Sequence, residues 1–255
     1  MSASRPGPVP AHRLRREADE PMARIDLGQM RYLDAWAVQR ELVAERQAGR
    51  GTDTLLLVEH PPVYTLGKRA DPTNVLLDAA TLAAEGIEVV EVDRGGDVTY
   101  HGPGQLVGYP VLVLAGVRTV VDYVRALEEV LIVALAELGV TGTRIEHLTG
   151  VWVDGAKIAA IGVRVASGGV TSHGFALNVA PDLGHFAGII PCGISDRAVC
   201  SLSELGVTAG MATVADTVAA AFAQVFAATL LVTPRSRSQP AGTVLPPPAP
   251  HPKAC

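Results

Sequence analysis

Three strand-like segments joined by two tight-turn signals constrain the fold of this chain most strongly. The segments cover residues 150–153, 157–165 and 171–179. Asp154-Gly155 separates the first two and Gly168-Gly169 separates the last two. Such dipeptides are favoured in the short turns of β-hairpins. Strands joined by hairpins are antiparallel neighbours, so a sheet built on this meander is not purely parallel.

Strand and helix signals interleave along the rest of the chain. We expect further strands at residues 23–27, 54–59, 87–92 and 106–114, and helices at 29–47, 78–85, 119–138, near Ser203 and at 213–228. Apolar residues recur at helical spacing in the two long helices. In the first helix they are Tyr32, Leu33, Trp36 and Val43, and in the second Val120, Val124, Leu127, Val130, Leu131 and Leu135. This order predicts an α/β (α+β) fold with a mixed, largely antiparallel sheet flanked by helices.

The chain has 255 residues, and its length favours one domain. Residues 1–22 are polar and contain prolines, and residues 233–255 form a Pro-rich end. Because such segments bury too little apolar surface to offset their ordering entropy, we expect a disordered tail at each end. The folded domain is then expected at residues 23–232.

Charge and cysteine usage exclude several classes of function. The net charge is -5 and no long basic run occurs, so we expect no nucleic-acid partner. No uninterrupted apolar stretch is long enough for a transmembrane helix, and the N-terminus lacks the apolar core of a secretory signal. Three cysteines without CxxC spacing suit a reducing compartment. We therefore expect a cytoplasmic protein with no membrane association, no structural zinc site and no cofactor.

A Gly-rich loop at residues 94–105 carries the densest functional signal. Its four glycines and one proline indicate a backbone in conformations that side chains would forbid, close to a ligand. Arg94, Tyr100 and His101 are interleaved with these glycines and can cap a polar group, stack or donate hydrogen bonds. The loop lacks the Lys-Ser/Thr ending of a P-loop and is not GxGxxG. A well-ordered surface loop is the alternative interpretation.

Lys157 begins an apolar strand. By strand alternation it shares one face with Ala159, Ile161, Val163 and Val165. A lysine at the rim of such a face either extends its ammonium to water or has a function. Beside a cysteine, its ammonium would favour the thiolate and its amine could carry the proton.

The segment 171–179 supplies a third candidate. Alternation places His173, Phe175 and Leu177 on one face, whereas Gly174 and Ala176 leave space on the other. A lane of small residues beside an apolar sheet suits an alkyl chain. Close packing against a helix would give the same spacing, and His173 could simply be a hydrogen-bonded structural histidine.

Cys192 is the best nucleophile candidate among the cysteines. It lies between Pro191 and Gly193, which place it at a turn, where a thiolate can be exposed to its electrophile. Cys200 lies in an ordinary core-like segment, and Cys255 is the last residue. The alternative for Cys192 is a small buried apolar residue, which is common for free cysteine.

Together these pieces resemble the lipoyl(octanoyl) transferase family. The matching stretches are Glu59–Lys68, Arg94–Gln105, Gly150–Val153, Lys157–Val163, His173–Val179 and Pro191–Gly193, in the family's order. The resemblance implies the fold of the biotin/lipoate protein ligase catalytic domain. It also implies transfer of an octanoyl group from octanoyl-acyl carrier protein to a lysine of a lipoyl domain. The acceptors would be the lipoyl domains of 2-oxoacid dehydrogenase complexes and the glycine cleavage H protein.

The resemblance further implies roles for individual residues. Cys192 corresponds to the residue that carries the acyl group as a thioester, and Lys157 to the residue that lowers its pKa and acts as acid and base. The implied substrate-binding residues are Arg94, Gly95, Gly96, Asp97, Val98, Thr99, Tyr100, His101, Ala160, Ile161, Gly162, His173, Gly174, Phe175 and Ala176.

An acidic donor would need a local basic patch, since the chain itself is net negative. The candidates are Arg31, Arg40, Arg46, Arg50, Lys68 and Arg69. Two other activities remain open. An ATP-dependent lipoate ligase would share the fold without needing a nucleophilic cysteine, and a thioesterase would use water as the acceptor. A non-catalytic module that sequesters acyl groups is a third alternative, which the pairing of Cys192 with Lys157 disfavours.

Overall fold

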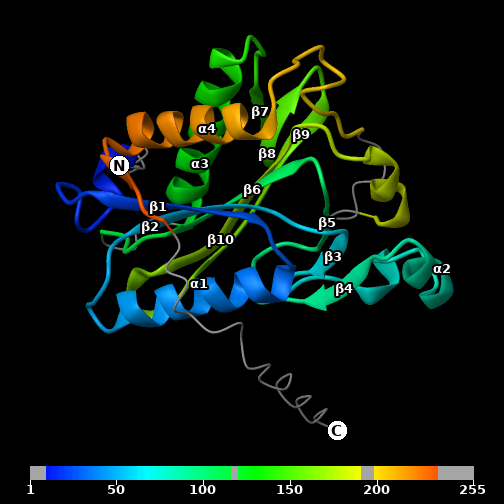
Figure 1. The fold of residues 1–255 in the computed structure, drawn as a ribbon, viewed down its shortest axis with the longest axis horizontal. Helices are drawn as coiled ribbons and strands as arrows, with labels where there is room; N and C mark the ends of the chain where they lie inside the picture. Colours follow the sequence, from blue (N-terminus) through cyan, green and yellow to red (C-terminus); the bar gives the residue numbers. More distant parts are fainter. Residues whose placement is uncertain (1–9, 116–119, 191–197, 235–255) are drawn as a thin grey trace, which may run out of the picture.

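The computed structural model describes residues 10–115, 120–190 and 198–234. Its main sheet contains β1 (Met22–Gln29), β2 (Thr54–Glu59), β6 (Gln105–Val111), β7 (Thr143–Ile145), β8 (Leu148–Val153), β9 (Ala156–Val165), β10 (Thr171–Asn178) and β11 (Leu230–Val232). Within the described residues the strand order is β11-β1-β2-β6-β10-β9-β8-β7 (Figure 1). β1 pairs in parallel with β11 and β2, and the other neighbours are antiparallel. The predicted mixed, largely antiparallel sheet is confirmed.

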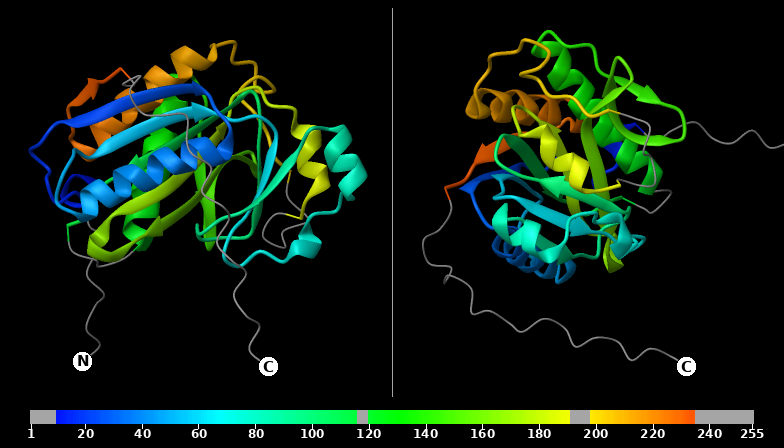
Figure 2. Two further views of the ribbon diagram at one scale, coloured as in Figure 1. Left: turned by 60° about the horizontal axis from the view of Figure 1, so that its bottom comes forward. Right: turned by 90° about the vertical axis from the view of Figure 1, so that its right-hand side faces the viewer.

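A smaller sheet lies beside the main one. It consists of β3 (Val63–Leu66), β4 (Glu88–Glu91) and β5 (Val98–His101), in the order β4-β3-β5. The short helices α2 (Ala79–Ala84) and η4 (Leu183–Gly188) lie next to each other at its outer side (Figure 2). Of its strands only β4 is predicted from the sequence. Its core contains Tyr64, Val98 and Tyr100.

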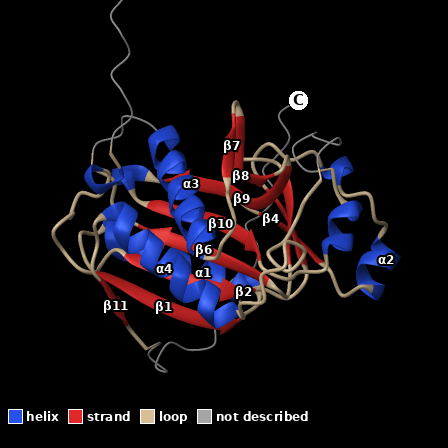
Figure 3. Cartoon of the chain, turned by 90° about the horizontal axis from the view of Figure 1, so that it is seen from above, coloured by secondary structure: helices blue, strands red, loops and turns tan. Residues whose placement is uncertain are grey.

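Helices cover both faces of the main sheet. The helices α3 (Val120–Glu137) and α4 (Met211–Phe226) lie on one face, and α1 (Tyr32–Gln47) lies on the other (Figures 1 and 3). The predicted stripe of α3 is buried at Leu127, Val130, Leu131 and Leu135. Val120 and Val124, at its N-terminal end, instead line a cavity described below.

The helix α1 is predicted correctly, and its buried face is predicted in part. It buries Tyr32, Ala35, Gln39, Val43 and Arg46, whereas Leu33 is exposed. Two of these side chains are polar and have partners in the core. The Gln39 Oε1 atom accepts a hydrogen bond from the His173 backbone N–H at 2.9 Å. Apolar spacing therefore identified Tyr32 and Val43 correctly, wrongly included Leu33, and missed the buried polar residues Gln39 and Arg46.

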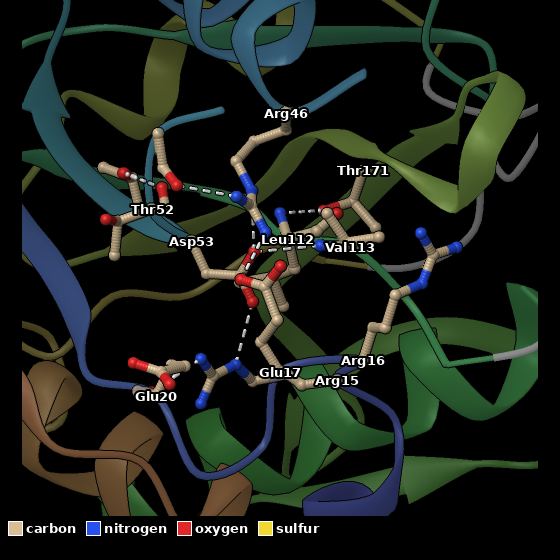
Figure 4. A network of polar contacts seen from close by, with 12 residues as sticks. Arg15, Arg16, Glu17, Glu20, Arg46, Thr52, Asp53, Leu112, Val113 and Thr171 are labelled. Carbon is tan, nitrogen blue, oxygen red and sulfur yellow. Dashed lines mark hydrogen bonds and ion pairs between the residues drawn. The ribbon is translucent and has the colours of Figure 1, made fainter. Parts of the chain in front are cut away.

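The expected N-terminal tail is wrong for residues 10–22. A 3-10 helix, η1 (Ala11–Arg13), leads into a segment whose backbone bonds to residues 113–115. The Arg15 Nε atom lies 3.0 Å from Asp53 Oδ2, and Arg46 Nε lies 3.2 Å from Asp53 Oδ1 (Figure 4). Leu14 and Met22 also pack in the main core, so the segment is held by a few apolar side chains together with a buried ion pair, which its overall polar composition does not reveal.

Two of the predicted turns are present, and one predicted helix is absent. Asp154 and Gly155 both have positive φ, 48° and 83°, as the tight hairpin between β8 and β9 requires. The second turn contains the 3-10 helix η3 (Ser167–Gly169). The remaining 3-10 helix of the described residues is η2 (Pro72–Asn74). The residues around Ser203 form a turn rather than a helix, and it ends at Gly206, whose φ is 81°.

Candidate active site

A cavity of about 440 Å³ opens where the Gly-rich loop crosses β9 and β10. The Gly95 N–H fastens the loop to β9 by donating to the Val163 carbonyl at 3.0 Å. The predicted residues that line the cavity are Arg94, Gly95, Gly96, Asp97, Val98, Thr99, His101, Lys157, Ala160, Ile161, Gly162, His173, Gly174, Phe175 and Ala176. Three separate segments of the sequence, the loop, β9 and β10, thus meet around one cavity.

Tyr100 is the predicted pocket residue that does not line this cavity. Side chains alternate along β5, so Tyr100 points away from its neighbours Thr99 and His101. It packs in the small sheet's own core, with its ring 5.0 Å from the His185 ring and 5.3 Å from the Phe186 ring. Tyr100 therefore supports the loop from behind.

A β-bulge decides where Lys157 points. Trp152 pairs with Lys157 but Val151 pairs with Ala159, which leaves Ile158 as an extra residue in β9. The expectation that Lys157 shares a face with Ala159 is wrong, because the bulge turns Lys157 to the opposite face. There it lines the cavity together with Ala160 and Gly162, and its Nζ atom lies 4.7 Å from the centre of the Trp152 ring.

Arg94 places a buried cation at the cavity wall. Its Nη2 atom donates to the carbonyl and to the hydroxyl of Thr65, at 2.6 and 2.9 Å. A Cβ atom at Gly162 would lie 3.1 Å from both the Arg94 Cδ atom and the Gly95 carbonyl oxygen. The absence of a side chain at Gly162 therefore lets the loop lie close to β9 and keeps this part of the cavity free.

His173 adopts a left-handed backbone conformation, with φ of 57°. The prediction that it shares a face with Phe175 is wrong for this reason. Phe175 packs in the core under α3 and α4, whereas the His173 ring contacts the Trp36 and Tyr109 rings on the α1 side. Its Nε2 atom lies 2.7 Å from Asp93 Oδ1. Burial lowers the pKa of His173 below the ordinary value, and it outweighs Asp93, which favours the protonated ring.

Two further histidines and two tyrosines form an aromatic cluster at the cavity. Burial lowers the pKa of His101 to about 3 and that of His60 to about 4, so both are neutral near pH 7. The Tyr32 ring stacks on the His101 ring at 5.9 Å, and the Tyr109 hydroxyl lies 2.7 Å from His60 Nε2. Among the described residues, no three histidine, cysteine or carboxylate side chains converge on a metal-binding point.

The sequence interpretation missed several lining residues. They are Tyr32, Arg69, Tyr109, Val120, Val124, His147, Leu148 and Thr149. Tyr32, Val120 and Val124 were assigned to helix stripes and Arg69 to a basic patch. The other four lie in segments without a motif of their own in the predicted site. A signal for Tyr32 was available, because a tyrosine at the first residue of α1 can present its hydroxyl beyond the end of the helix.

Cys192 lies outside the described residues, as do its neighbours Pro191 and Gly193. The described residues on either side of this segment are anchored. Ile190 N–H donates to the Asn74 carbonyl at 2.9 Å, and Lys157 exchanges backbone hydrogen bonds with Ala198 and Cys200 at 2.9 and 3.0 Å. The chain that follows Cys192 thus pairs with the strand that carries Lys157.

Cys200 lacks the properties of a nucleophile. It is buried, and its Sγ atom lies 3.8 Å from the Ala156 carbonyl oxygen. Burial raises its thiol pKa to about 11, so little thiolate exists at neutral pH. The prediction that Cys200 belongs to the core is confirmed.

Proteins of one known family are similar in sequence to most of this chain. A family model described as "Lipoyl protein ligase A/B catalytic domain" matches residues 31–223. An octanoyltransferase of Chloroflexus aurantiacus is 54% identical over 205 residues, which cover 79% of this chain and 92% of that protein. An octanoyltransferase of Mycolicibacterium smegmatis is 51% identical over 213 residues, covering 81% of this chain and 90% of that protein.

Solved structures with the same fold are more distant in sequence. A lipoate-protein ligase A bound with ATP superposes with a TM-score of 0.73 at 15% identity, covering 86% of this chain and 90% of that one. A bi-partite lipoate protein ligase from Thermoplasma acidophilum gives 0.67 at 16% identity, covering 86% and 89%. The fold is therefore that of the lipoate ligase catalytic domain, and the chain belongs to the octanoyltransferase family of acyltransferases.

Proposed function

We propose that this protein transfers an octanoyl group from octanoyl-acyl carrier protein to a lysine of a lipoyl domain, through a thioester on Cys192. The observation that supports this most is the placement of Lys157. The bulge at Ile158 turns its side chain into a cavity of about 440 Å³, within the range of small-molecule sites. Its backbone pairs with the segment that follows Cys192.

In the first half of the reaction, the Lys157 amine takes the proton of the Cys192 thiol. The thiolate attacks the carbonyl carbon of the donor thioester, a new C–S bond forms and the bond to the carrier sulfur breaks. The released carrier thiolate takes the proton back from Lys157. One thioester replaces another, so this step is nearly balanced in free energy and needs no ATP.

In the second half, the lysine amine of the acceptor domain attacks the acyl-enzyme. An amide C–N bond forms, the C–S bond to Cys192 breaks, and the proton lost by the amine returns to the thiolate through Lys157. Amide formation from a thioester is downhill, which makes the transfer irreversible in practice. Two acyl transfers through one covalent intermediate predict ping-pong kinetics.

Fewer basic residues are available to dock an acidic donor than the sequence predicts. Arg46 is wrong as a candidate because it is buried against Asp53, and Arg31 is paired with Glu88 at 2.7 Å. Lys68 and Arg69 are exposed, have no ion pair within the described ranges, and Arg69 lines the cavity. We propose that the carrier docks at Lys68 and Arg69, with lipoyl domains of 2-oxoacid dehydrogenases and the H protein as later acceptors.

No helix in the described part of the chain has the length and apolar character needed to span a membrane. We propose a cytoplasmic location, because three cysteines without CxxC spacing suit a reducing compartment.

Intact mass spectrometry after incubation with octanoyl-acyl carrier protein tests the proposal. The wild-type protein and a Cys200→Ala control are expected to gain one octanoyl group, and Cys192→Ala is expected to gain none. Loading should proceed without ATP, and transfer to a lipoyl domain should exceed hydrolysis. Strict ATP dependence would support a ligase instead, and release of free octanoate in the presence of acceptor would support a thioesterase.

A further inference from the structure

A chain of buried hydrogen bonds runs from the Gly-rich loop to the segment that follows Cys192. The His101 Nδ1 atom lies 2.7 Å from Gln105 Oε1, and Gln105 Nε2 donates to Asn178 Oδ1 at 2.9 Å. Asn178 Nδ2 donates to the Cys200 carbonyl at 2.9 Å. All three side chains are buried. Because Gln105 and Asn178 are directly opposite in β6 and β10, their amides meet without distortion of the sheet.

The last acceptor fixes the direction of every bond in this chain. A backbone carbonyl can only accept, so the Asn178 side chain must point its NH2 group at Cys200 and its oxygen at Gln105. Gln105 must then donate to Asn178 and turn its own oxygen to His101. It follows that the His101 proton is on Nδ1 and that Nε2 carries the lone pair. His101 also lines the cavity.

The same carbonyl belongs to a segment that holds Lys157. The Cys200 N–H donates to the Lys157 carbonyl at 3.0 Å, and the Lys157 N–H donates to the Ala198 carbonyl at 2.9 Å. The Leu202 N–H donates to the Asn178 backbone carbonyl at 3.0 Å, so Asn178 contacts this segment through both its side chain and its main chain. One asparagine thus connects the histidine of the loop with the strand of the lysine.

We propose that Asn178 is a positioning residue for the acyl transfer. It holds residues 198–200 against Lys157 and, through Gln105, fixes the tautomer of His101 at the cavity. The inference rests on the proposed function, since it assigns to Asn178 the alignment of Lys157 with the Cys192 segment. Misalignment of a reacting group by about 1 Å can slow a reaction about 100-fold.

A purely structural role would also make Asn178 important, because an unsatisfied buried amide is destabilising. Thr171 provides the matched control. It lies at the other end of β10 and is equally buried. Its Oγ1 atom donates to the Pro110 carbonyl at 2.8 Å and accepts from the Leu112 N–H at 2.9 Å. Thr171→Val therefore removes two buried hydrogen bonds from the same strand, far from Lys157.

The test compares Asn178→Asp, Asn178→Leu and Thr171→Val with the wild-type protein, at equal concentrations of folded enzyme. The first variant places an acceptor against the Cys200 carbonyl, and the second removes both polar groups without adding charge. We expect both to load octanoyl from octanoyl-acyl carrier protein about 10- to 100-fold more slowly. We also expect the midpoint of the pH profile for loading to shift, because the Lys157–Cys192 alignment changes. Thr171→Val should keep the wild-type rate and midpoint.

A measurement independent of activity tests the other half of the proposal. In ¹⁵N-labelled wild-type protein, the His101 ring should show the shifts of a neutral histidine protonated at Nδ1. In Asn178→Leu the direction of the chain is no longer imposed, so the Nε2–H form should become populated. An Nε2–H tautomer in the wild-type protein would overturn the proposal.

The proposal is also overturned if folded Asn178 variants load at the wild-type rate and pH midpoint, or if Thr171→Val changes both as much as they do. These failures differ from failure of the proposed function. If Cys192 of the wild-type protein gains no octanoyl group, the acyl-enzyme mechanism itself is wrong, and with it the positioning role.

Discussion

Two buried polar clusters lie at opposite ends of β6 and β10, and they use opposite chemistry. At one end, Asp53 binds two arginines and accepts the Val113 N–H at 3.1 Å (Figure 4). At the other end, His101, Gln105 and Asn178 form a chain of neutral groups. The charged groups pair with one another, whereas the neutral chain ends at a histidine that lines the cavity. We infer that the ion pairs of Asp53 hold the N-terminal segment against the sheet. The neutral hydrogen bonds at the other end instead orient side chains at the cavity.

The largest expected effect concerns the charged cluster. Asp53→Asn keeps the shape but removes the carboxylate that pairs with the buried Arg15, and it leaves Arg46 with Glu17 as its carboxylate partner. Removing one partner of a buried ion pair costs about 3 to 5 kcal/mol. We expect that loss in the free energy of unfolding, measured with urea. The loading rate per folded molecule should stay unchanged. A loss below about 1 kcal/mol would show that the cluster does not fasten the N-terminal segment.

The second prediction concerns how the free energy of unfolding depends on pH, through the neutral histidines near the cavity. His60 and His101 have folded pKa values of about 4 and about 3, below the ordinary value of 6.5. The unfolded chain therefore binds more protons below pH 6.5, so stability is complete above that pH and falls on acidification. Between pH 6 and 4 each histidine should lower the free energy of unfolding by about 1 kcal/mol per pH unit. Urea unfolding at several pH values should show a smaller slope for His60→Gln, and equal slopes would contradict the assignment.

A smaller effect is expected at the cavity wall. Gly162→Ala adds a Cβ atom 3.1 Å from the Arg94 Cδ atom and the Gly95 carbonyl oxygen, which narrows the cavity where we propose that the acyl chain binds. We expect kcat/KM for octanoyl transfer to fall about 10-fold, the effect of roughly one methylene group in an apolar pocket. A shorter acyl donor should lose less. An equal loss for both donors would mean that Gly162 acts on the loop rather than on chain length.

Sequence patterns predicted the parts of this molecule that local chemistry determines. Asp154-Gly155 indicated its hairpin because that turn requires positive φ at both residues. The Gly-rich loop indicated a ligand site, and most of its residues do line the cavity. Lys157 does line the cavity, although the alternation argument that selected it placed its side chain on the wrong face.

The parts that sequence patterns missed depend on contacts between distant segments. The bulge at Ile158 and the left-handed His173 each reverse a side chain that simple alternation had placed on the other face. The burial of Arg15 is understandable only once Asp53 is seen beside it. Tyr109 contributes to the cavity because β6 lies next to β10, and this pairing has no local signal.

The central claim is that Lys157 ionises the sulfur of Cys192, and the rate of Cys192 alkylation against pH measures this most directly. Iodoacetamide modification can be followed by peptide mass spectrometry in the wild-type protein and in Lys157→Ala, with Cys200 as an internal control whose pKa is about 11. We predict a midpoint for Cys192 below the ordinary thiol value of about 8.5 in the wild-type protein and a higher midpoint in Lys157→Ala. Identical midpoints in the two proteins would contradict the account.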